Sequence, residues 1–287
     1  MSKYDYNKDY FNKIDSHEKA YWLGFLYADG CITRFYKNDK LKSMSLEITL
    51  CNNDKEHLEK FKKSLQSNVP IREKIVTLNN GKTYISNRIN INCTKMCYDL
   101  IKLGCVPNKT FEIEMPNNSI LPDIYVSSFI RGFFDGDGCI SVTKMNNKPH
   151  IVVTITGIEK MLSGLIQKLI NEKIIRIRNP KIHHDTRSSA CSFYLYGDIA
   201  KEFLDYIYEN SEIHLDRKYN KYIEFYKNYC LDNYHGVNWS NRNKAYVVTI
   251  YMNGKRIRIG QSKDLNEAIN MRKDAEYEKM NQNKQPT

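Results

Sequence analysis

Two aspartates in nearly identical surroundings are the residues of this chain best suited to chemistry. Asp29 and Asp137 are each followed by Gly-Cys-Ile, and the stretches 20–32 and 128–140 align at a constant offset of 108 residues. An internal repeat of this kind predicts a duplicated structural unit. Two carboxylates brought together repel each other, and divalent cations relieve that repulsion. The pair therefore favours the chemistry of a divalent metal site.

Small residues recur at every fourth position before each aspartate, which predicts two closely packed helices. They are Ala20, Gly24 and Ala28 in one stretch, and Ser128, Gly132 and Gly136 in the other. Positions four apart share one helix face, and a face without bulk lets another backbone approach. We expect the two helices to be partners, to end at Asp-Gly in a left-handed turn, and to hold Asp29 and Asp137 side by side.

A simpler explanation exists for either stretch alone, because tight packing followed by a turn gives the same pattern. A membrane-spanning interpretation is excluded, since each apolar run is short and ends on a carboxylate. Two copies in register favour a paired-helix active site.

The two stretches resemble the motif of the LAGLIDADG homing endonuclease family, whose nine letters align with residues 22–30 and 130–138. The resemblance covers most of residues 1–230. It implies an α+β fold in which two αββαββα halves, 1–118 and 119–231, form a single-chain pseudo-dimer. It also implies that Asp29 and Asp137 bind Mg²⁺, as two or more divalent ions, and that the chain acts in intron homing as part of a mobile genetic element.

A lysine follows each half at a similar distance. Lys109 lies 80 residues beyond Asp29, and Lys218 lies 81 beyond Asp137. A lysine beside a scissile phosphate stabilises developing negative charge or tunes the attacking water, and the resemblance implies such a catalytic role. A solvated surface lysine is an equal alternative for each.

Apolar periodicity predicts the elements that position these residues. A capping box formed by Asp15 and Glu18 starts the first motif helix near Ser16. Alternation predicts strands after Cys31 and at 45–50, 84–93, 139–145, 151–156 and 191–196. Helical spacing predicts helices at 56–65, 95–103, 159–172 and 198–208, the second of them closed by Gly104.

The chain is basic, with 44 Lys and Arg against 33 Asp and Glu, which favours a polyanionic partner such as nucleic acid. A solvated, lysine-rich surface is the alternative. The outward strand faces carry our candidates for DNA contact, which are Arg34, Lys37, Lys42, Arg88, Lys144, Lys148, Arg176, Arg178 and Arg187. Eight scattered cysteines and no apolar signal segment predict a soluble intracellular protein, in an infected cell's cytoplasm or an organelle.

Residues 235–287 predict a separate small unit of three strands and a helix. Asn253-Gly254 signals a hairpin, and Asp264 begins a helix reaching about Met280. The stretch resembles the AP2 DNA-binding domain through Gly236-Val-x-Trp239, Asn253-Gly254-Lys-Arg and Gly260. The resemblance implies a sheet in the major groove, with DNA contacts from Arg242, Thr249, Tyr251, Arg256 and Arg258. A structural cap on the main domain is the alternative.

Together these features predict a monomeric, site-specific DNA endonuclease. It would make metal-dependent double-strand breaks at a long, asymmetric target in double-stranded DNA. Two alternatives remain, namely an RNA maturase that assists splicing of intron RNA and a non-cleaving sequence-specific DNA-binding protein. Retention of both Asp29 and Asp137 argues against the second alternative.

Overall fold

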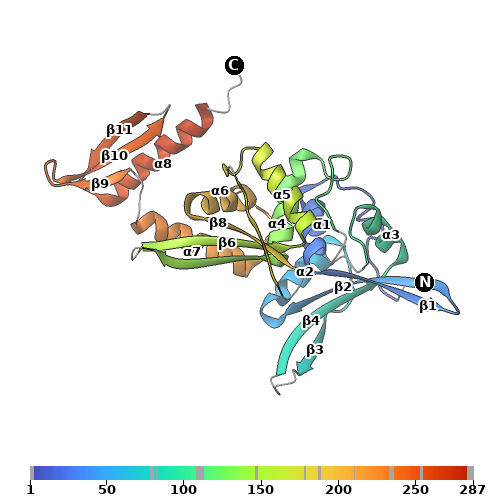
Figure 1. The fold of residues 1–287 in the computed structure, drawn as a ribbon. Coiled ribbons are helices and arrows are strands. Elements are labelled where there is room, and N and C mark those ends of the chain that lie inside the picture. The colour runs from blue at the N-terminus through green and yellow to red at the C-terminus, as the bar shows by residue number, and fades with distance from the viewer. Residues whose placement is uncertain are drawn as a thin grey trace. The chain divides into compact units, whose positions relative to one another are not determined.

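The computed structural model describes most of the chain in two compact units (Figure 1). The described residues are 3–77, 81, 83–107, 113–145, 148–177, 179–186, 189–209, 211–232, 236–252 and 255–282. The larger unit comprises residues 1–222 and the smaller one residues 223–287, and each is described by itself.

The larger unit repeats one order of elements twice. The first copy contains α1 (His17–Asp29), β1 (Gly30–Lys37), β2 (Lys40–Cys51), α2 (Lys55–Ser64), β3 (Arg72–Thr77), β4 (Thr83–Asn92) and α3 (Thr94–Lys102). The second contains α4 (Val126–Asp137), β5 (Gly138–Met145), β6 (Lys148–Gly157), α5 (Glu159–Asn171), β7 (Ile182–His184), β8 (Cys191–Tyr196) and α6 (Gly197–Tyr208). The predicted αββαββα duplication is confirmed, and α7 (Asp216–Asp232) follows it.

Each copy builds a four-stranded antiparallel sheet of the same topology. The strand orders are β1-β2-β4-β3 and β5-β6-β8-β7. In the first sheet Leu46 lies opposite Ile91 and Ile48 opposite Ile89, and all four side chains are buried. Neighbours along a strand point to opposite faces, so these buried residues mark one face of the sheet. The helices cover that face, and the other face stays open.

Helices α1 and α4 pack against each other along their small residues (Figure 1). A Cβ atom added at Gly24 would lie 2.0 Å from the Phe129 carbonyl oxygen, and one at Gly132 would lie 1.9 Å from that of Tyr21. Any side chain at either position would force the backbones apart. The predicted pairing of the two motif helices is therefore confirmed, and the spacing of small residues is its cause.

The start of α1 falls where the sequence predicts it, with a different cap. The Ser16 hydroxyl accepts a hydrogen bond from the Lys19 backbone N–H at 3.2 Å. Asp15 instead pairs with the Lys19 ammonium at 2.8 Å, and Glu18 accepts from the Tyr10 hydroxyl. The capping residue is therefore Ser16 and not the predicted Asp15–Glu18 box.

The C-terminal ends of α1 and α4 differ from the predicted left-handed turns. Gly30 and Gly138 have φ values of −74° and −95°, so neither adopts the predicted left-handed turn. The chain passes directly from helix into strand. A Cβ atom at Gly30 would lie 2.7 Å from the Leu26 carbonyl oxygen, and one at Gly138 would lie 2.1 Å from the Phe134 ring. Glycine is required there for close approach and not for its conformational freedom.

The two edge strands, β3 and β7, were not predicted from periodicity. Strand β7 has only three residues, and β3 opens with the charged run Arg-Glu-Lys. Ile85 belongs to the predicted strand at 84–93, yet it is 47% exposed. It pairs with Ile75 on β3, and both lie beyond the part of the sheet that helices cover.

The smaller unit is the predicted three-stranded sheet with one helix. Strands β9 (Val237–Ser240), β10 (Ala245–Met252) and β11 (Lys255–Ser262) lie in the order β11-β10-β9, and α8 spans Leu265–Gln282. Asp264 caps α8 by accepting a hydrogen bond from the Glu267 backbone N–H at 2.9 Å.

Two isoleucines of β11 are exposed, and a shift in register accounts for one of them, Ile259. Val248 pairs with Gly260 and Thr249 with Arg258, so Ile259 has no partner on β10. Val248 and Ile250 are buried, whereas Ile259 is 39% exposed and Ile257, which pairs with Ile250, is 43% exposed. The space above Gly260 is filled by Met271 of α8.

Candidate functional site

Asp29 and Asp137 are the last residues of α1 and α4, and both are half-buried. A Cβ atom at Gly136 would lie 3.3 Å from Oδ2 of Asp29 and 2.2 Å from the Ala28 Cβ. The carboxylate of Asp29 therefore lies against the turn of α4 that ends in Asp137. Two acids at adjacent helix C-termini are unfavourable without a cation, because the helix dipole is negative there.

Lys218 lies in the first turn of α7, directly behind the end of α4. It is 3% exposed, and its ammonium donates to the carbonyl oxygens of Phe134, Asp135 and Gly136 at 2.7, 2.7 and 3.1 Å. Three N–H donors thus meet three acceptors, so the group is saturated. These carbonyls belong to the last turn of α4, where the helix dipole is negative, and Lys218 neutralises their partial charge. The Phe134 carbonyl also accepts a hydrogen bond from the Gly138 backbone N–H.

Burial lowers the pKa of Lys218 to about 8, while the negative charges of Asp135, Asp29 and Asp137 oppose this change. The lysine is thus charged at neutral pH. The sequence placed Lys218 after the last helix as a residue near the phosphate. The structure places it inside a helix, where it supports the turn that carries Asp137.

Asp135 is a buried carboxylate that the sequence interpretation did not single out. Its oxygens accept hydrogen bonds from the hydroxyls of Tyr208 and Tyr21 at 2.6 and 2.7 Å and from the Leu215 N–H at 2.7 Å. Burial raises the pKa of Asp135, and the hydrogen bonds from the two tyrosines oppose the rise. The sequence signal that could have identified Asp135 was a carboxylate within an otherwise apolar helix segment.

Arg131 and His57 extend this buried network to both copies. Arg131 donates to the carbonyls of Ile207 and Ile213 at 2.7 and 2.9 Å. Nε2 of His57 lies 3.0 Å from the Tyr21 hydroxyl. Because that hydroxyl donates to Asp135, Nε2 must carry the proton. Nδ1 of His57 has no hydrogen-bond partner among the described residues, and burial lowers the pKa of His57 to about 3.

The first turn of α7 connects the second copy to the first. Asp216 pairs with Lys60 of α2 at 2.6 Å, and Arg217 pairs with the buried Asp54 at 3.1 Å. Lys218, the next residue, holds the end of α4. Three consecutive residues thus fix the support beneath the two aspartates.

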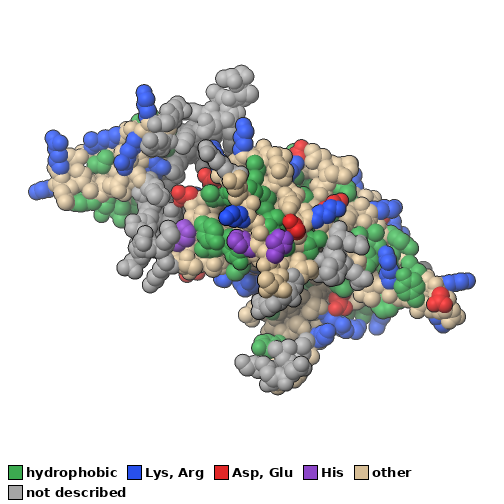
Figure 2. All heavy atoms as spheres, in the orientation of Figure 1, with side chains coloured by type: hydrophobic (Ala, Val, Ile, Leu, Met, Phe, Trp, Pro, Cys, Tyr) green, Lys and Arg blue, Asp and Glu red, His purple; other side chains and the backbone are tan. Residues whose placement is uncertain are grey.

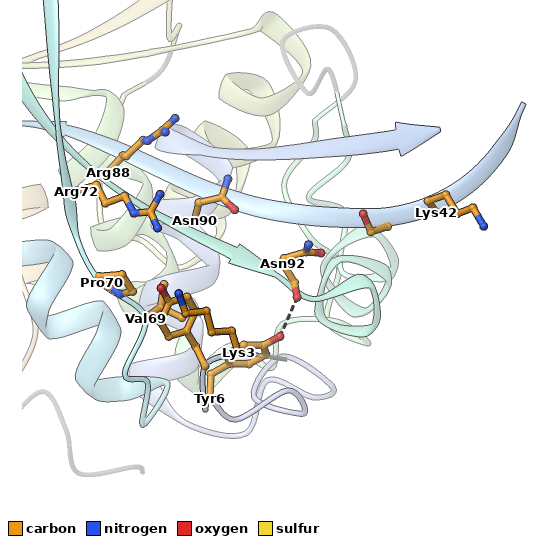
Figure 3. A pocket seen from close by; sticks show the side chains of 11 residues that line it. Lys3, Tyr6, Lys42, Val69, Pro70, Arg72, Arg88, Asn90 and Asn92 are labelled. Atoms are coloured by element: carbon orange, nitrogen blue, oxygen red, sulfur yellow. Dashed lines mark hydrogen bonds between the residues drawn. The ribbon is translucent and has the colours of Figure 1, made fainter. Parts of the chain in front are cut away.

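The open face of the first sheet carries a basic, amide-rich groove of about 910 Å³ (Figure 3). Lys42, Arg72, Arg88, Asn90 and Asn92 line it. Arg88 lies between Thr49 and Arg72 on the neighbouring strands and contacts Glu47 at 3.5 Å. The predicted residues Lys42 and Arg88 thus lie together, and Arg72 was missed because β3 was not predicted.

Other predicted DNA contacts are more scattered. Arg34 pairs with the buried Met44, so it projects from the sheet face opposite Arg88, where the β1–β2 hairpin extends past the core. Lys37 lies at the hairpin end, and Lys144 and Lys148 occupy the ends of β5 and β6. Arg176 is exposed between α5 and β7, not on a strand. Lys109, Arg178 and Arg187 lie outside the described residues.

The open face of the second sheet differs chemically from that of the first. His183, Tyr194, Tyr196 and His150 form an aromatic row, with successive ring centroids 5.2, 6.2 and 6.3 Å apart. Figure 2 shows histidine side chains gathered on this part of the surface. The sequence analysis predicted the strand at 191–196 but not the aromatic row, whose members come from β6, β7 and β8.

The register of the smaller unit's sheet places its four strand candidates in two opposed pairs. Thr249 pairs with Arg258 and Tyr251 with Arg256, and directly opposed residues share a face. The Arg256 Nε donates to the Thr249 hydroxyl at 3.1 Å. Arg242 is exposed in the turn between β9 and β10.

The aspartate pair has the donor set of a hard divalent ion. Within the described part of the chain, no group of three or more His, Cys, Asp or Glu side chains is placed to hold a metal. Mg²⁺ is commonly bound through one or two carboxylates, with waters and substrate phosphates as its remaining ligands. Asp29 and Asp137 fit that arrangement.

Comparison with known proteins identifies the architecture. A family model described as a LAGLIDADG-like domain matches residues 125–208, which span α4 to α6. The homing endonuclease I-WcaI bound to its DNA recognition sequence superposes with a TM-score of 0.53 at 14% identity, covering 74% of this chain and 90% of that one. The chain has the LAGLIDADG homing endonuclease fold.

Two further similarities accompany the LAGLIDADG fold. The endonuclease I-SmaMI, bound to an uncleaved DNA target in the presence of calcium ions, gives a TM-score of 0.45 at 14% identity over 72% of this chain and 89% of that one. A probable translation initiation factor IF-2 of Methanocaldococcus jannaschii is 26% identical over 183 residues, or 62% of this chain. The match spans only 14% of that factor's length. Among the described helices, none has the length and apolar character needed to span a bilayer.

Proposed function

We propose that this chain is a site-specific DNA endonuclease that cuts both strands of a long, asymmetric target. The observation that carries the proposal is the position of the Asp29 carboxylate, which lies against Gly136 and hence beside Asp137. Two acids on paired helices, flanked by two open sheets, offer one acid for each strand of a duplex. The DNA-bound state of I-WcaI, which shares the fold, supports double-stranded DNA as the partner.

Asp29 and Asp137 would hold Mg²⁺ in this proposal. Bound there, the divalent ions would activate water and stabilise charge on the scissile phosphates. The chain's own residues set the geometry: Gly24 and Gly132 bring the helices together, and Lys218 keeps the last turn of α4 fixed. Because its three donors are already used, we assign Lys218 to positioning Asp137 rather than to direct contact with phosphate.

The two sheets would bind the duplex through their open faces. Arg72, Arg88 and Lys42 provide cations for phosphates and base edges on the first sheet. The smaller unit, residues 235–287, would act as an AP2-like accessory module whose Arg256 and Arg258 contact DNA. We keep the halves 1–118 and 119–231 as functional domains and propose that the chain acts as a monomer.

The test is cleavage of a randomised DNA library with Mg²⁺, followed by sequencing of the cut ends. Asp29→Asn and Asp137→Asn should each abolish double-strand breaks, because each removes one carboxylate of the pair. Asp198→Asn, which changes an exposed acid at the start of α6, serves as the matched control and should cut normally. Recurrent breaks with both aspartate variants would refute the assigned site, whereas retention of intron RNA without DNA cleavage would favour a maturase.

A further inference from the structure

The N-terminal arm, residues 3–15, forms one wall of the groove on the open face of the first sheet. Lys3, Tyr4 and Tyr6 line the groove on one side, and Arg72, Asn90 and Asn92 line it from β3 and β4 (Figure 3). The position of the arm makes it part of the same concave surface as the strand residues.

The arm is fastened to the body of the first copy at several points. The Tyr6 hydroxyl donates to the Asn92 carbonyl at 2.8 Å, and the Asn7 N–H donates to the Leu65 carbonyl at 2.8 Å. Asp5 and Asn68 exchange hydrogen bonds through backbone and side chain. Tyr10 and Phe11 are buried in the core. These contacts fix the position of Lys3 at the start of the arm.

The groove presents cations that the protein does not neutralise. Among the described residues, Lys3, Lys42 and Arg72 form no ion pair, and Arg88 alone of the four contacts a carboxylate, that of Glu47. Uncompensated cations in a concave, amide-lined surface attract an extended anion, and a phosphate backbone supplies one.

No equivalent arm is seen on the open face of the second copy among its described residues, which lack 108–112 before α4. Its segment before α4 is held on the helix side, where Glu114 pairs with Lys160 and Asp123 pairs with Lys168 of α5. As far as the structure describes them, the two copies therefore differ in how far their open surfaces extend.

We propose that the N-terminal arm extends the DNA interface on the side of the first copy alone, with Lys3 contacting a backbone phosphate. The inference rests on the proposed endonuclease function and adds a contact to it. It predicts a footprint that is longer over the half-site bound by the first sheet than over the other.

The test compares Lys3→Ala with Lys63→Ala in the full chain, using the target selected from the library and Ca²⁺ in place of Mg²⁺. Both lysines are exposed, but Lys63 lies on α2, away from the open face. The slope of log affinity against log salt is negative, and each lost phosphate contact reduces its magnitude by about 0.9. We expect that reduction for Lys3→Ala, an unchanged slope for Lys63→Ala, and unchanged thermal unfolding for both.

Hydroxyl-radical footprinting should show lost protection at one end of the site only for Lys3→Ala. A wild-type slope and footprint in this variant, or an equal effect of Lys63→Ala, would overturn the arm contact while leaving the endonuclease proposal in place. If the unaltered chain retains no DNA from the library, both proposals fail.

Discussion

At the scale of single residues, the buried ammonium of Lys218 links the stability of the fold to the position of Asp137. Its three carbonyl acceptors are all on the last turn of α4. An apolar side chain there would remove this donor from all three carbonyls, of which that of Phe134 would keep the Gly138 backbone N–H. Hydrogen bonds to charged groups and buried charge pairs are the contacts whose loss is most costly.

We predict that Lys218→Met lowers the free energy of unfolding by about 3 kcal/mol. The measurement is urea denaturation, with Lys221→Met as control, because Lys221 is exposed and donates to one carbonyl, that of Ile140. A loss no larger than that of the control would mean that the ammonium does not hold the helix end.

The lowered pKa of Lys218 gives a pH dependence of defined sign. Between pH 8 and the ordinary lysine value, the unfolded chain binds more protons at this residue than the folded chain. The stability of the wild type should therefore rise with pH relative to Lys218→Met from about pH 8 to pH 10. Paired urea titrations at pH 7.5 and 9.5 test this, and a constant difference would contradict it.

His57 should make the fold acid-sensitive. Burial lowers the pKa of His57 to about 3. Between about pH 6.5 and pH 3 the unfolded chain therefore binds a proton at this residue that the folded chain does not bind. Stability is lost as pH falls through that window. His57→Gln should flatten the dependence by up to about 1.4 kcal/mol per pH unit, whereas the exposed His183→Gln should leave it as steep as in the wild type.

At the scale of elements, the close approach of α1 and α4 sets the separation of the two acids. Gly132→Ala would place a Cβ against the Tyr21 carbonyl, so the helices must separate. We predict that the free energy of unfolding falls by about 3 kcal/mol. We also predict that cleavage at saturating DNA is lost. Ser127→Ala, a neighbour on α4 away from this contact, is the control. Normal cleavage by Gly132→Ala would show that the acids tolerate a wider spacing.

The motif helices and the strands that follow them were predictable because their residues obey local rules. Gly24 and Gly132 mark the contact by spacing alone, and Leu46, Ile48, Ile89 and Ile91 mark the covered face by alternation. Edge strand β3 escaped prediction because it buries little and so needs no apolar pattern. Arg72 was missed with it.

The supporting network beneath Asp137 was beyond sequence reasoning for another reason. Asp135 receives partners from α1, from α6 and from the Leu215 backbone, and no local pattern records such long-range contacts. The helix-ending glycines show the same limit, because the atoms that exclude a Cβ there become visible only in three dimensions.

At the scale of the whole molecule, chemistry and added affinity should be separable. We predict that removing residues 235–287 weakens binding to the selected target and leaves metal-dependent cleavage intact at saturating protein. A tethered second site acts through effective concentration, so its loss changes affinity and not the bond-breaking step. Cleavage and equilibrium binding, measured side by side, test this. Lost cleavage at saturation would assign the smaller unit a role in catalysis.

The first turn of α7 also limits how the protein can be re-engineered by exchanging halves. A chimaera that takes its second half from another protein would also bring in a new partner for α4. It would lose Asp216 and Arg217, which pair with Lys60 and Asp54 of the retained half. Asp54 would then be left as a buried carboxylate without its guanidinium. Workable exchanges must either transplant these two positions or replace Asp54 and Lys60 in the same step.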